Sequence, residues 1–370
     1  MQYTNLQKDS NKLLKKAKRK YINYPFMSSL LDLQSKNYKF YLLTASCLNT
    51  YQVENNDVKA GFYCKLKCCP NCNNIRTGIR ISNYLHQLPE ILHFGTVTVP
   101  NCTINKLSGV IKKMLKDFHQ IREQCKRKGY PITGIASLEI TINIKTKTYH
   151  PHIHYLISSV PIWRNKQPYE LKYHIKEKVN EYINGYMVGS QQTIKYHNLV
   201  NERWLILNPT ANENLQNIKP VHTWYKQGEN GQQEYGERSV FELFKYLSKP
   251  QTPGKILPGQ TIAQFKKQEI RKQSIYSKMY DELFTVMKGK RTFFTYNLRL
   301  PLTEEQENDQ FSKTKAIKSI ASEGVYNWQK TGWVSSEGEV LAHYEPTKKE
   351  QQINKMLLQK TKKLATIVSN

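Results

Sequence analysis

The sequence predicts an α+β protein in which a central antiparallel sheet packs on helices. Residues 93–99 are rich in Val and Thr, which is typical of a strand. From Leu107 onward, apolar residues recur at helical spacing, and residues 138–158 contain two neighbouring segments that alternate apolar and polar side chains. The chain has 370 residues, enough for two modest domains or for one large domain with extensions.

The composition favours a polyanionic partner. Lys and Arg number 56 against 29 acidic residues, which gives a formal net charge of +27. Such an excess indicates nucleic acid rather than an acidic small molecule. No run of 18 apolar residues occurs, and no apolar signal core follows Met1. We therefore expect neither a membrane span nor secretion, and we expect a cytoplasmic location.

The order of these features predicts three consecutive parts. Residues 1–90 form a basic N-terminal segment and a Cys-rich module, and residues 91–250 form the domain with the central sheet. Pro250, followed by Pro253-Gly254, marks its end. Residues 251–370 are Lys-rich and mostly helical in propensity, and we expect a basic helical extension there.

Basic side chains follow a predicted helix within residues 1–40. They are Lys12, Lys15, Lys16, Lys18, Arg19 and Lys20. A solvated helix face and a contact with the DNA backbone both explain such a run, and the sequence does not decide between them.

The Cys-rich module predicts a structural zinc site. Seven cysteines, an odd number, fit metal ligation better than a disulfide framework. The motif Cys64-x4-Cys69-Pro-Asn-Cys72 supplies three thiolates, and tetrahedral zinc needs a fourth ligand. Cys47 is the more attractive fourth ligand, because neighbouring residues such as Cys68 and Cys69 rarely bind one ion together. We expect Cys102 and Cys125 to be free buried thiols.

The first half of the central domain contains a strand and a long helix. The strand at 93–99 runs into Pro100, and Gly129 is placed to end the helix. The apolar positions of this helix are Leu107, Val110, Ile111, Met114, Leu115, Phe118, Ile121 and Cys125.

A β-hairpin follows, and it carries three histidines on one face. The first strand alternates Leu138, Ile140, Ile142 and Ile144 with polar residues. The second strand, 149–158, places alternate residues on opposite faces. The histidines on its polar face are His150, His152 and His154.

Adjacent imidazoles on this strand are close enough to hold one divalent ion. If paired residue numbers sum to 293, Glu139 lies opposite His154 and supplies a carboxylate ligand. A one-residue slip would move Glu139 to the apolar face, which the alternation disfavours.

Two further helices are predicted, at 166–187 and 239–249, on either side of an Asn- and Gln-rich region. The second places Glu242, Tyr246 and Lys249 on one side. Tyr246 has the nucleophile to attack a phosphate, Lys249 a charge to stabilise the phosphate or phenolate, and Glu242 a carboxylate to accept a proton. The same spacing is also typical of a solvated helix face.

Four motifs in order give the chain a resemblance to a known family. They are Cys-Lys-Leu-Lys-Cys-Cys-Pro-Asn-Cys, Gly-Thr-Val-Thr-Val-Pro-Asn, Leu-Glu-Ile-Thr with Thr-Tyr-His-Pro-His-Ile-His-Tyr-Leu-Ile, and Lys-Tyr-Leu-Ser-Lys. Together, from about Cys47 to Pro250, they resemble the replication initiators of small rolling-circle plasmids. These are single-strand endonucleases of the HUH superfamily, in which two histidines flank a hydrophobic residue.

The resemblance implies a metal-dependent nicking and joining enzyme for single-stranded or cruciform origin DNA. His152 and His154 match the metal-binding pair, with Mn²⁺ or Mg²⁺ as the metal, and His150 also matches the pattern. Tyr246 matches the nucleophile that becomes linked to the 5′-phosphate. Glu242 matches a carboxylate that activates water for termination, and Lys249 matches the motif.

Further contacts are expected beyond the reaction centre. Arg76 and Lys245 are expected to contact DNA, and a host helicase is a candidate partner. Residues 188–236 and the segment after 250 depart from the family pattern, so origin recognition is not assigned to them.

Three alternatives use part of these features. A transposase or a mobilisation relaxase has the same chemistry on different DNA ends. A histidine-triad nucleotide hydrolase also has His-x-His-x-His, but it explains neither the cysteines nor the charge. A zinc-bearing DNA-binding regulator leaves the histidines and Tyr246 without a function.

Overall fold

The computed structural model describes most of the chain and divides it into two compact units. The described residues are 2–88, 92–158, 162–164, 167–169, 196–212, 217–221, 224–227, 233–236, 262–298, 303, 305–307, 309, 317–319 and 321–358. One unit comprises Met1–Ile79, Ser248–Thr285 and Leu302–Asn370, and the other comprises Arg80–Leu247 and Val286–Pro301. We call them the cysteine unit and the histidine unit. The predicted three-part division at residues 90 and 250 stays a prediction.

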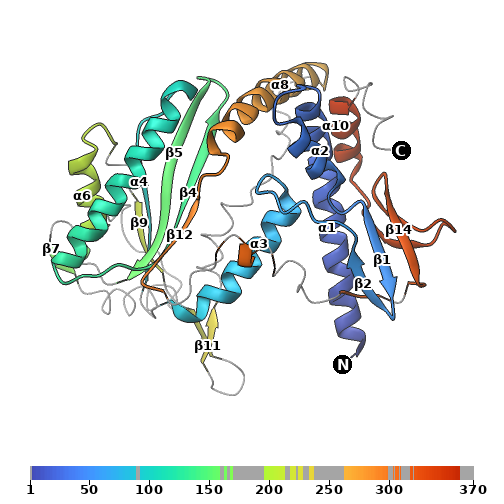
Figure 1. The fold of residues 1–370 in the computed structure, drawn as a ribbon, viewed down its shortest axis with the longest axis horizontal. Coiled ribbons are helices and arrows are strands. Elements are labelled where there is room, and N and C mark those ends of the chain that lie inside the picture. The colour runs from blue at the N-terminus through green and yellow to red at the C-terminus, as the bar shows by residue number, and fades with distance from the viewer. Residues whose placement is uncertain are drawn as a thin grey trace, which may run out of the picture. The chain divides into compact units, whose positions relative to one another are not determined.

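The histidine unit is built on a five-stranded antiparallel sheet (Figure 1). The strand order is β12-β4-β5-β3-β9, and every neighbouring pair is antiparallel. Their bounds are β3 Leu92–Thr98, β4 Thr133–Asn143, β5 Thr148–Ser158, β9 Asn217–Val221 and β12 Phe293–Tyr296. The histidine-bearing strand β5 is therefore the middle strand, and the predicted α+β class with a central antiparallel sheet is confirmed.

Helix α4 (Ile104–Arg127) packs on one face of this sheet. Its buried residues follow the predicted helical spacing and include Leu107, Ile111, Met114, Phe118, Ile121 and Cys125. The Phe118 ring lies 6.0 Å from the Tyr155 ring of β5 and 5.9 Å from the Tyr296 ring of β12. The chain leaves the helix through Gly129, whose φ of +83° favours glycine. The predicted helix and its end are both confirmed.

Smaller elements complete the described part of the histidine unit. They are β6 Ile162–Arg164, β7 Gln167–Tyr169, β8 Tyr196–Asn198, α6 Leu199–Leu207, β10 Trp224–Gln227 and β11 Gln233–Gly236. Strand β7 shows that the predicted helix at 166–187 is wrong at its start, because residues 167–169 pair with β6 instead. Residues 170–195 and the predicted helix at 239–249 lie outside the described residues.

The cysteine unit contains a six-stranded antiparallel sheet in the order β13-β2-β1-β14-β15-β16. The strands are β1 Thr50–Glu54, β2 Asp57–Ala60, β13 Ile317–Lys318, β14 Gly324–Gln329, β15 Gly332–Val334 and β16 Val340–His343. Tyr51, Val53, Tyr326 and Trp333 are buried in one core with residues of α1 (Gln2–Leu31). The Trp333 indole donates a hydrogen bond to the Leu48 carbonyl at 2.8 Å, which satisfies its only polar group inside this core.

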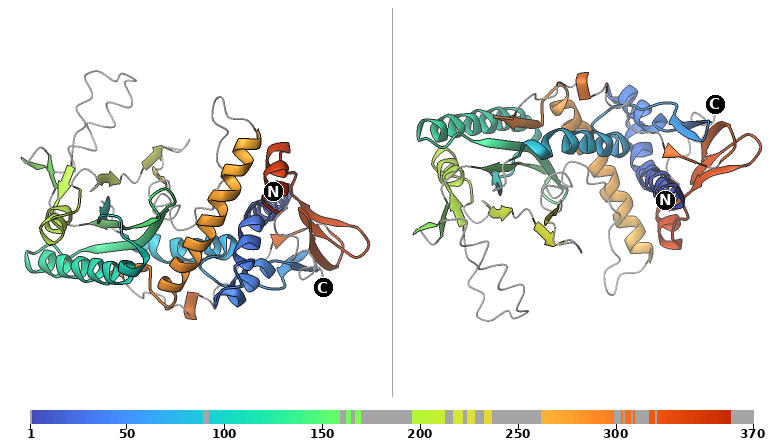
Figure 2. Two further views of the ribbon diagram at one scale, coloured as in Figure 1. Left: turned by 90° about the horizontal axis from the view of Figure 1, so that it is seen from above. Right: turned by 90° about the horizontal axis from the view of Figure 1, so that it is seen from below.

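Helices surround that sheet and include both helices described after residue 250. They are α2 Tyr38–Ser46, α3 Pro70–Tyr84, α8 Ile262–Met287 and α10 Lys348–Leu358. The last residues of α3 and the short 3₁₀ helix η1 (Leu85–Gln87) after it belong to the histidine unit. Figure 2 shows α8 and α10 beside α1. Asp281 of α8 accepts hydrogen bonds from Ser35, Asn37 and Tyr41 at 2.7, 2.9 and 2.7 Å, which ties α8 to the α1–α2 turn.

The segment after residue 250 thus has the expected helices α8 and α10, and it also contributes strands that the sequence did not indicate. Tyr326, Trp328 and Trp333 belong to these strands, with Tyr326 and Trp333 in the buried core. Within the described residues, no helix is long and apolar enough to span a membrane.

Candidate functional site

The β4–β5 hairpin sets the position of the candidate site. Glu139 pairs with His152, Ser137 with His154 and Thr141 with His150. The predicted pairing of Glu139 with His154 is therefore wrong by two residues. The cause is the turn: the Asn143 side chain accepts hydrogen bonds from the backbone N–H groups of residues 145 and 146, so the strands part after Asn143. A shift of two residues preserves the face, and Glu139 still lies with the histidines.

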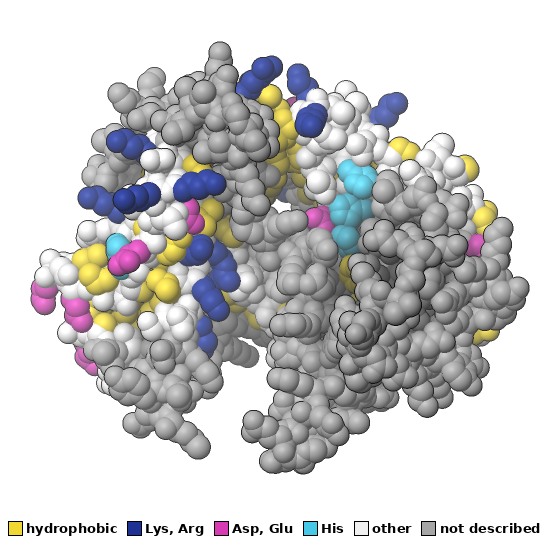
Figure 3. All heavy atoms as spheres, turned by 180° about the vertical axis from the view of Figure 1, so that it is seen from behind, with side chains coloured by type: hydrophobic (Ala, Val, Ile, Leu, Met, Phe, Trp, Pro, Cys, Tyr) yellow, Lys and Arg dark blue, Asp and Glu magenta, His cyan; other side chains and the backbone are white. Residues whose placement is uncertain are grey.

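Three side chains converge on this face. The Glu139 Oε2 atom is 3.1 Å from His154 Nε2 and 3.3 Å from His152 Nε2. The ligand atoms of the three residues all lie within 4.8 Å of one another. Figure 3 shows a row of histidine side chains beside one acidic side chain on this side of the molecule. Two imidazoles and a carboxylate form a donor set suited to a divalent cation.

The other ring nitrogens fix the orientation of the two imidazoles. His152 Nδ1 is 3.1 Å from the His150 carbonyl, which can only accept, so Nδ1 of His152 carries the proton. His154 Nδ1 is 2.8 Å from Thr96 Oγ1, and the Phe94 ring stacks on His154 at 5.7 Å and 17°. Both Nε2 atoms are thereby left to face Glu139, which is the arrangement that outer partners give to metal-binding histidines.

The electrostatics of the cluster keep its carboxylate ionised. Burial by itself raises the pKa of Glu139, but hydrogen bonds and charge from His152 and His154 outweigh burial and lower that pKa to about 2. For His150, burial and the neighbouring His152 lower the pKa. Its ring lies 5.2 Å from the His152 ring, outside the three-residue cluster, and its expected role as a ligand stays a prediction.

Ser137 adds a buried hydroxyl to the histidine face. Its side chain is 1 % exposed, and its hydroxyl has no hydrogen-bond partner among the described residues. Ser137 lies two residues before Glu139 on β4 and directly across from His154, so it shares their face. Buried hydroxyls are normally hydrogen-bonded, so Ser137 offers a hydrogen-bonding group beside the two histidines.

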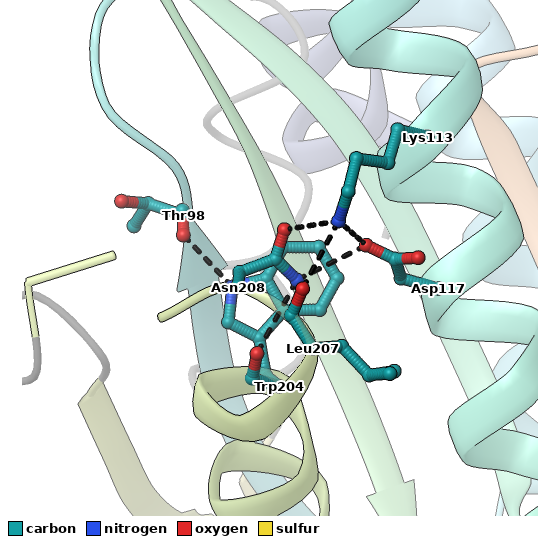
Figure 4. Close-up of polar contacts among 6 residues, drawn as sticks. All are labelled: Thr98, Lys113, Asp117, Trp204, Leu207 and Asn208. Atoms are coloured by element: carbon teal, nitrogen blue, oxygen red, sulfur yellow. Dashed lines mark hydrogen bonds and ion pairs between the residues drawn. The ribbon is translucent and has the colours of Figure 1, made fainter. Parts of the chain in front are cut away.

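Helix α6 supports strand β3, which is the neighbour of the histidine strand β5. The Trp204 indole donates to the carbonyl of Thr98 at 2.8 Å, and Thr98 pairs with His152. Figure 4 shows how Lys113 of α4 holds the end of α6: its ammonium contacts Asp117 Oδ2 at 2.5 Å, Asn208 Oδ1 at 2.9 Å and the carbonyl before Asn208 at 3.1 Å. This network fixes the strand on which the candidate site depends.

The cysteine unit contains a second cluster. The sulfur atoms of Cys47, Cys64, Cys69 and Cys72 all lie within 4.8 Å of one another. Cys72 Sγ is 3.4 Å from Cys47 Sγ and 3.6 Å from Cys64 Sγ. Zinc bound tetrahedrally at about 2.3 Å separates its sulfurs by ~3.8 Å, so the four thiols fit this ion.

Cysteines outside this cluster have other surroundings. Cys68 Sγ lies 3.3 Å from Thr44 Oγ1 rather than with the four, so the geometry favours Cys47 as the fourth member. Cys102 and Cys125 are buried and free, as expected.

Hydrogen bonds and burial give the cysteines of this cluster different acidities. Hydrogen bonds from Cys47, Cys64 and Cys72 hold the pKa of the Cys69 thiol well below its ordinary value. The buried Lys20 ammonium donates to the Cys47 carbonyl at 2.7 Å. The Tyr51 hydroxyl, buried and without a hydrogen-bond partner among the described residues, has its pKa raised by burial and by neighbouring anionic groups that include Cys47. Hydrogen bonds within the cluster and burial raise the pKa values of the Cys47 and Cys72 thiols, so Cys69 is the member whose surroundings favour a thiolate.

The remaining predicted site residues are not part of either cluster. Arg76 is 1 % exposed: it donates to the Lys65 carbonyl at 2.7 Å and lies 3.3 Å from Glu307 Oε2. A guanidinium buried in this way has almost no surface for a phosphate, which argues against the predicted DNA contact. Glu242, Lys245, Tyr246 and Lys249 lie outside the described residues.

Sequence reasoning missed the supporting residues of the histidine site. Thr96 and Thr98 lie two apart on the predicted strand 93–99, so the alternation already placed them on one face. Nothing in the sequence showed that this face is the histidine face, because that depends on the pairing of β3 with β5. Trp204 belongs to a helix that the sequence did not indicate.

Comparison with known proteins finds relatives for part of the chain. Residues 55–170 match the model of a family described as Replication protein. A Protein rep from Streptococcus pneumoniae serotype 2 (strain D39 / NCTC 7466) is 32% identical over 108 residues, which cover 26% of this chain and 32% of that protein. A Protein rep from a Bacillus species is 31% identical over 111 residues, covering 28% of this chain and 35% of the relative. A Protein rep from Bacillus amyloliquefaciens is 31% identical over 111 residues, covering 28% and 32%.

These matches confirm the resemblance to replication initiators that the motifs predicted. The chain spans about a third of the length of the curated relatives it matches. No solved structure matches it.

Proposed function

We propose, with the resemblance to replication initiators as the premise, that the chain nicks and joins single-stranded DNA and so initiates and terminates rolling-circle replication. The observation that carries the proposal is the Glu139, His152 and His154 cluster on the middle strands of an antiparallel sheet. Ile153 separates the two histidines and packs in the core on the opposite face. A positively charged chain with such a cluster suits the cleavage of a polyanion.

In this proposal, the cluster holds Mn²⁺ or Mg²⁺ through the two Nε2 atoms and the Glu139 carboxylate. A divalent ion in this place supplies Lewis-acid polarisation of the scissile phosphate. The protein groups keep that place ready. The His150 carbonyl and the Thr96 hydroxyl hold the imidazoles in position, and Glu139 stays ionised because its pKa is low.

The nucleophile in the proposal is Tyr246, on the strength of the family resemblance. Its phenolic oxygen forms a bond to phosphorus while the bond to the 3′-oxygen breaks, so the protein becomes linked to the 5′-phosphate. An unperturbed tyrosine has a pKa of ~10, so a nearby cation such as Lys249 is needed to favour the phenolate. A DNA 3′-hydroxyl then rejoins the strand, or water activated by Glu242 releases the protein.

The second cluster has a structural role in the proposal. One Zn²⁺ is held by Cys47, Cys64, Cys69 and Cys72. It joins the end of α2, the loop before α3 and the start of α3. Four thiolate ligands leave no open position, which is typical of structural rather than catalytic zinc.

A labelled single-stranded oligonucleotide containing the origin nick site tests the function. With Mn²⁺, the protein should cleave it and carry the label as a shifted band on a denaturing gel, and EDTA should abolish both. Cleavage without a labelled protein band would indicate a hydrolase that forms no tyrosine adduct. Binding without cleavage would indicate a DNA-binding regulator. Cleavage of transposon or transfer-origin ends in preference to the replication origin would indicate a transposase or relaxase.

A further inference from the structure

Helix α4 has a second face that the site described above does not use. Its inner face packs on the sheet, on the side of Tyr155, and the histidines of β5 point to the opposite side because alternate residues of a strand face opposite ways. The outer face is exposed and strongly basic. Its exposed cations are Lys106, Lys112, Lys113, Lys116, Lys126 and Arg127.

The acidic residues of α4 do not compensate this charge. Asp117 is buried and bonded to Lys113 and Asn208, so it belongs to the network that holds α6 (Figure 4). Glu123 lies 3.3 Å from Arg122 on the same helix and is already paired. Lys113 is the one exposed α4 lysine that the described structure ties to an acidic group.

The other exposed cations of α4 have no partner among the residues that the structure describes, so their charges are available to an external anion. Within the described residues, the side chains of Lys106, Lys112, Lys116, Lys126 and Arg127 take part in no hydrogen bond or ion pair. From Lys106 to Arg127 the helix extends about 32 Å at ~1.5 Å per residue. Double-stranded DNA carries one phosphate charge per ~1.7 Å of axis when both strands are counted, which is ~3.4 Å per base pair. The length of the helix therefore matches about nine base pairs.

We propose that the outer face of α4 binds the phosphate backbone of double-stranded DNA, as a second contact surface on the opposite face of the sheet from the histidines. The identity of the partner as DNA rests on the proposed function. The exposed positions of α4 carry no Phe, Tyr or Trp, so the helix lacks the stacking groups with which proteins hold single strands. The histidine face of the sheet then stays available for the DNA strand that is cut.

The experiment measures binding of a duplex of about 20 base pairs, longer than the helix, by fluorescence anisotropy over a range of salt concentrations. The double variant K112A/K116A should weaken binding about tenfold or more at low salt and reduce the slope of log affinity against log salt by ~1.8, since each lost phosphate contact contributes ~0.9. The matched control is K36A/K39A, which removes two exposed lysines of the cysteine unit and should leave both quantities unchanged.

The outcomes separate this surface from the proposed reaction. Nicking of a short single-stranded oligonucleotide, too short to reach α4, should be the same for wild type and K112A/K116A. If no protein nicks, the proposed function fails, while the duplex measurement still decides on α4. An unchanged duplex slope for K112A/K116A, or an equal loss in K36A/K39A, overturns the proposal. A greater loss for single-stranded than for duplex DNA also overturns it.

Discussion

The two side-chain clusters of the molecule are built in opposite ways. The histidine cluster comes from regular strands, with ligands two residues apart on β5 and one across on β4, and the side chain of Glu139 is 21% exposed. The cysteine cluster comes from a helix end, a loop and a helix start, spread over 47–72, and three of its cysteines, Cys47, Cys69 and Cys72, are almost fully buried. The difference teaches that an accessible cluster with three protein ligands suits catalysis, while a closed cluster with four suits structure.

The largest effect is expected at the histidine cluster, to which we assign the proposed catalysis. His152→Ala or His154→Ala should reduce nicking by ~10³-fold, because a metal ion supplies several kcal/mol of transition-state stabilisation. Duplex binding should stay within about twofold, since backbone contacts come mainly from Lys and Arg. Cleavage assays and anisotropy on the same preparations measure both. The control His150→Ala should lose no more activity than His152→Ala, and undiminished metal-dependent cleavage by both main variants would refute the assignment.

The closed cluster should instead control stability. Cys72→Ser or removal of zinc by a chelator should lower the melting temperature of the cysteine unit by ~10 °C or more, because binding of structural zinc contributes directly to folding free energy. Calorimetry together with elemental analysis tests this. The control Cys68→Ser should keep its zinc and its melting temperature. Protein purified without chelators that contains no zinc would contradict the structural role.

The residues of the predicted helix at 239–249 separate two steps of the proposed reaction. Tyr246→Phe should lose the covalent adduct completely, because phenylalanine has no oxygen nucleophile. Glu242→Ala should slow adduct hydrolysis by ~10²-fold while strand transfer continues, since a missing general base costs about that much. Time courses of the labelled protein band should show long-lived adduct. If the variant does not nick at all, Glu242 is a structural or metal-supporting residue. If it turns over normally, a different group activates the water.

The smallest effect should come from the groups that orient the ligands. Thr96→Val removes the hydroxyl beside His154 Nδ1 and should weaken Mn²⁺ binding by ~10-fold, whereas Thr96→Ser should keep wild-type affinity. Mn²⁺ titration followed by electron paramagnetic resonance measures affinity without any reaction. Equal affinity in Thr96→Val and Thr96→Ser would show that the hydroxyl does not position the imidazole.

The sequence predicted the faces of the histidine hairpin better than its pairing. Alternation of Leu138 and Ile140 with polar residues was enough to place Glu139 and the histidines together. The register depended on one side chain, Asn143, whose hydrogen bonds to the turn end β4 one residue before the predicted Ile144 and let β5 begin one residue before the predicted Tyr149. Alternation reports which face a residue occupies, but not which residue lies opposite.

Contacts between residues far apart in the sequence account for the features that the sequence did not predict. Arg76 looked like a surface cation beside the cysteines, but Glu307, more than two hundred positions later, pairs with it in the interior. Strands β13–β16 have two to six residues each, too short for a reliable alternation pattern. The four clustered cysteines were predicted because tetrahedral ligation limits the choices, even though Cys47 lies 17 residues before Cys64.

The central position of β5 has a consequence for the kinetics of the site. Hydrogen-bonded neighbours flank the strand on both sides, β4 along its whole length and β3 opposite the residues from His152 to Ile157. Amide protons of such a strand exchange with solvent only when the sheet opens, so those of His152 and His154 should be among the slowest to exchange in the histidine unit. A site on this strand does not have to refold between one turnover and the next. The proposed reaction, which cuts at the beginning of a replication round and again at its end, would use the same geometry on both occasions.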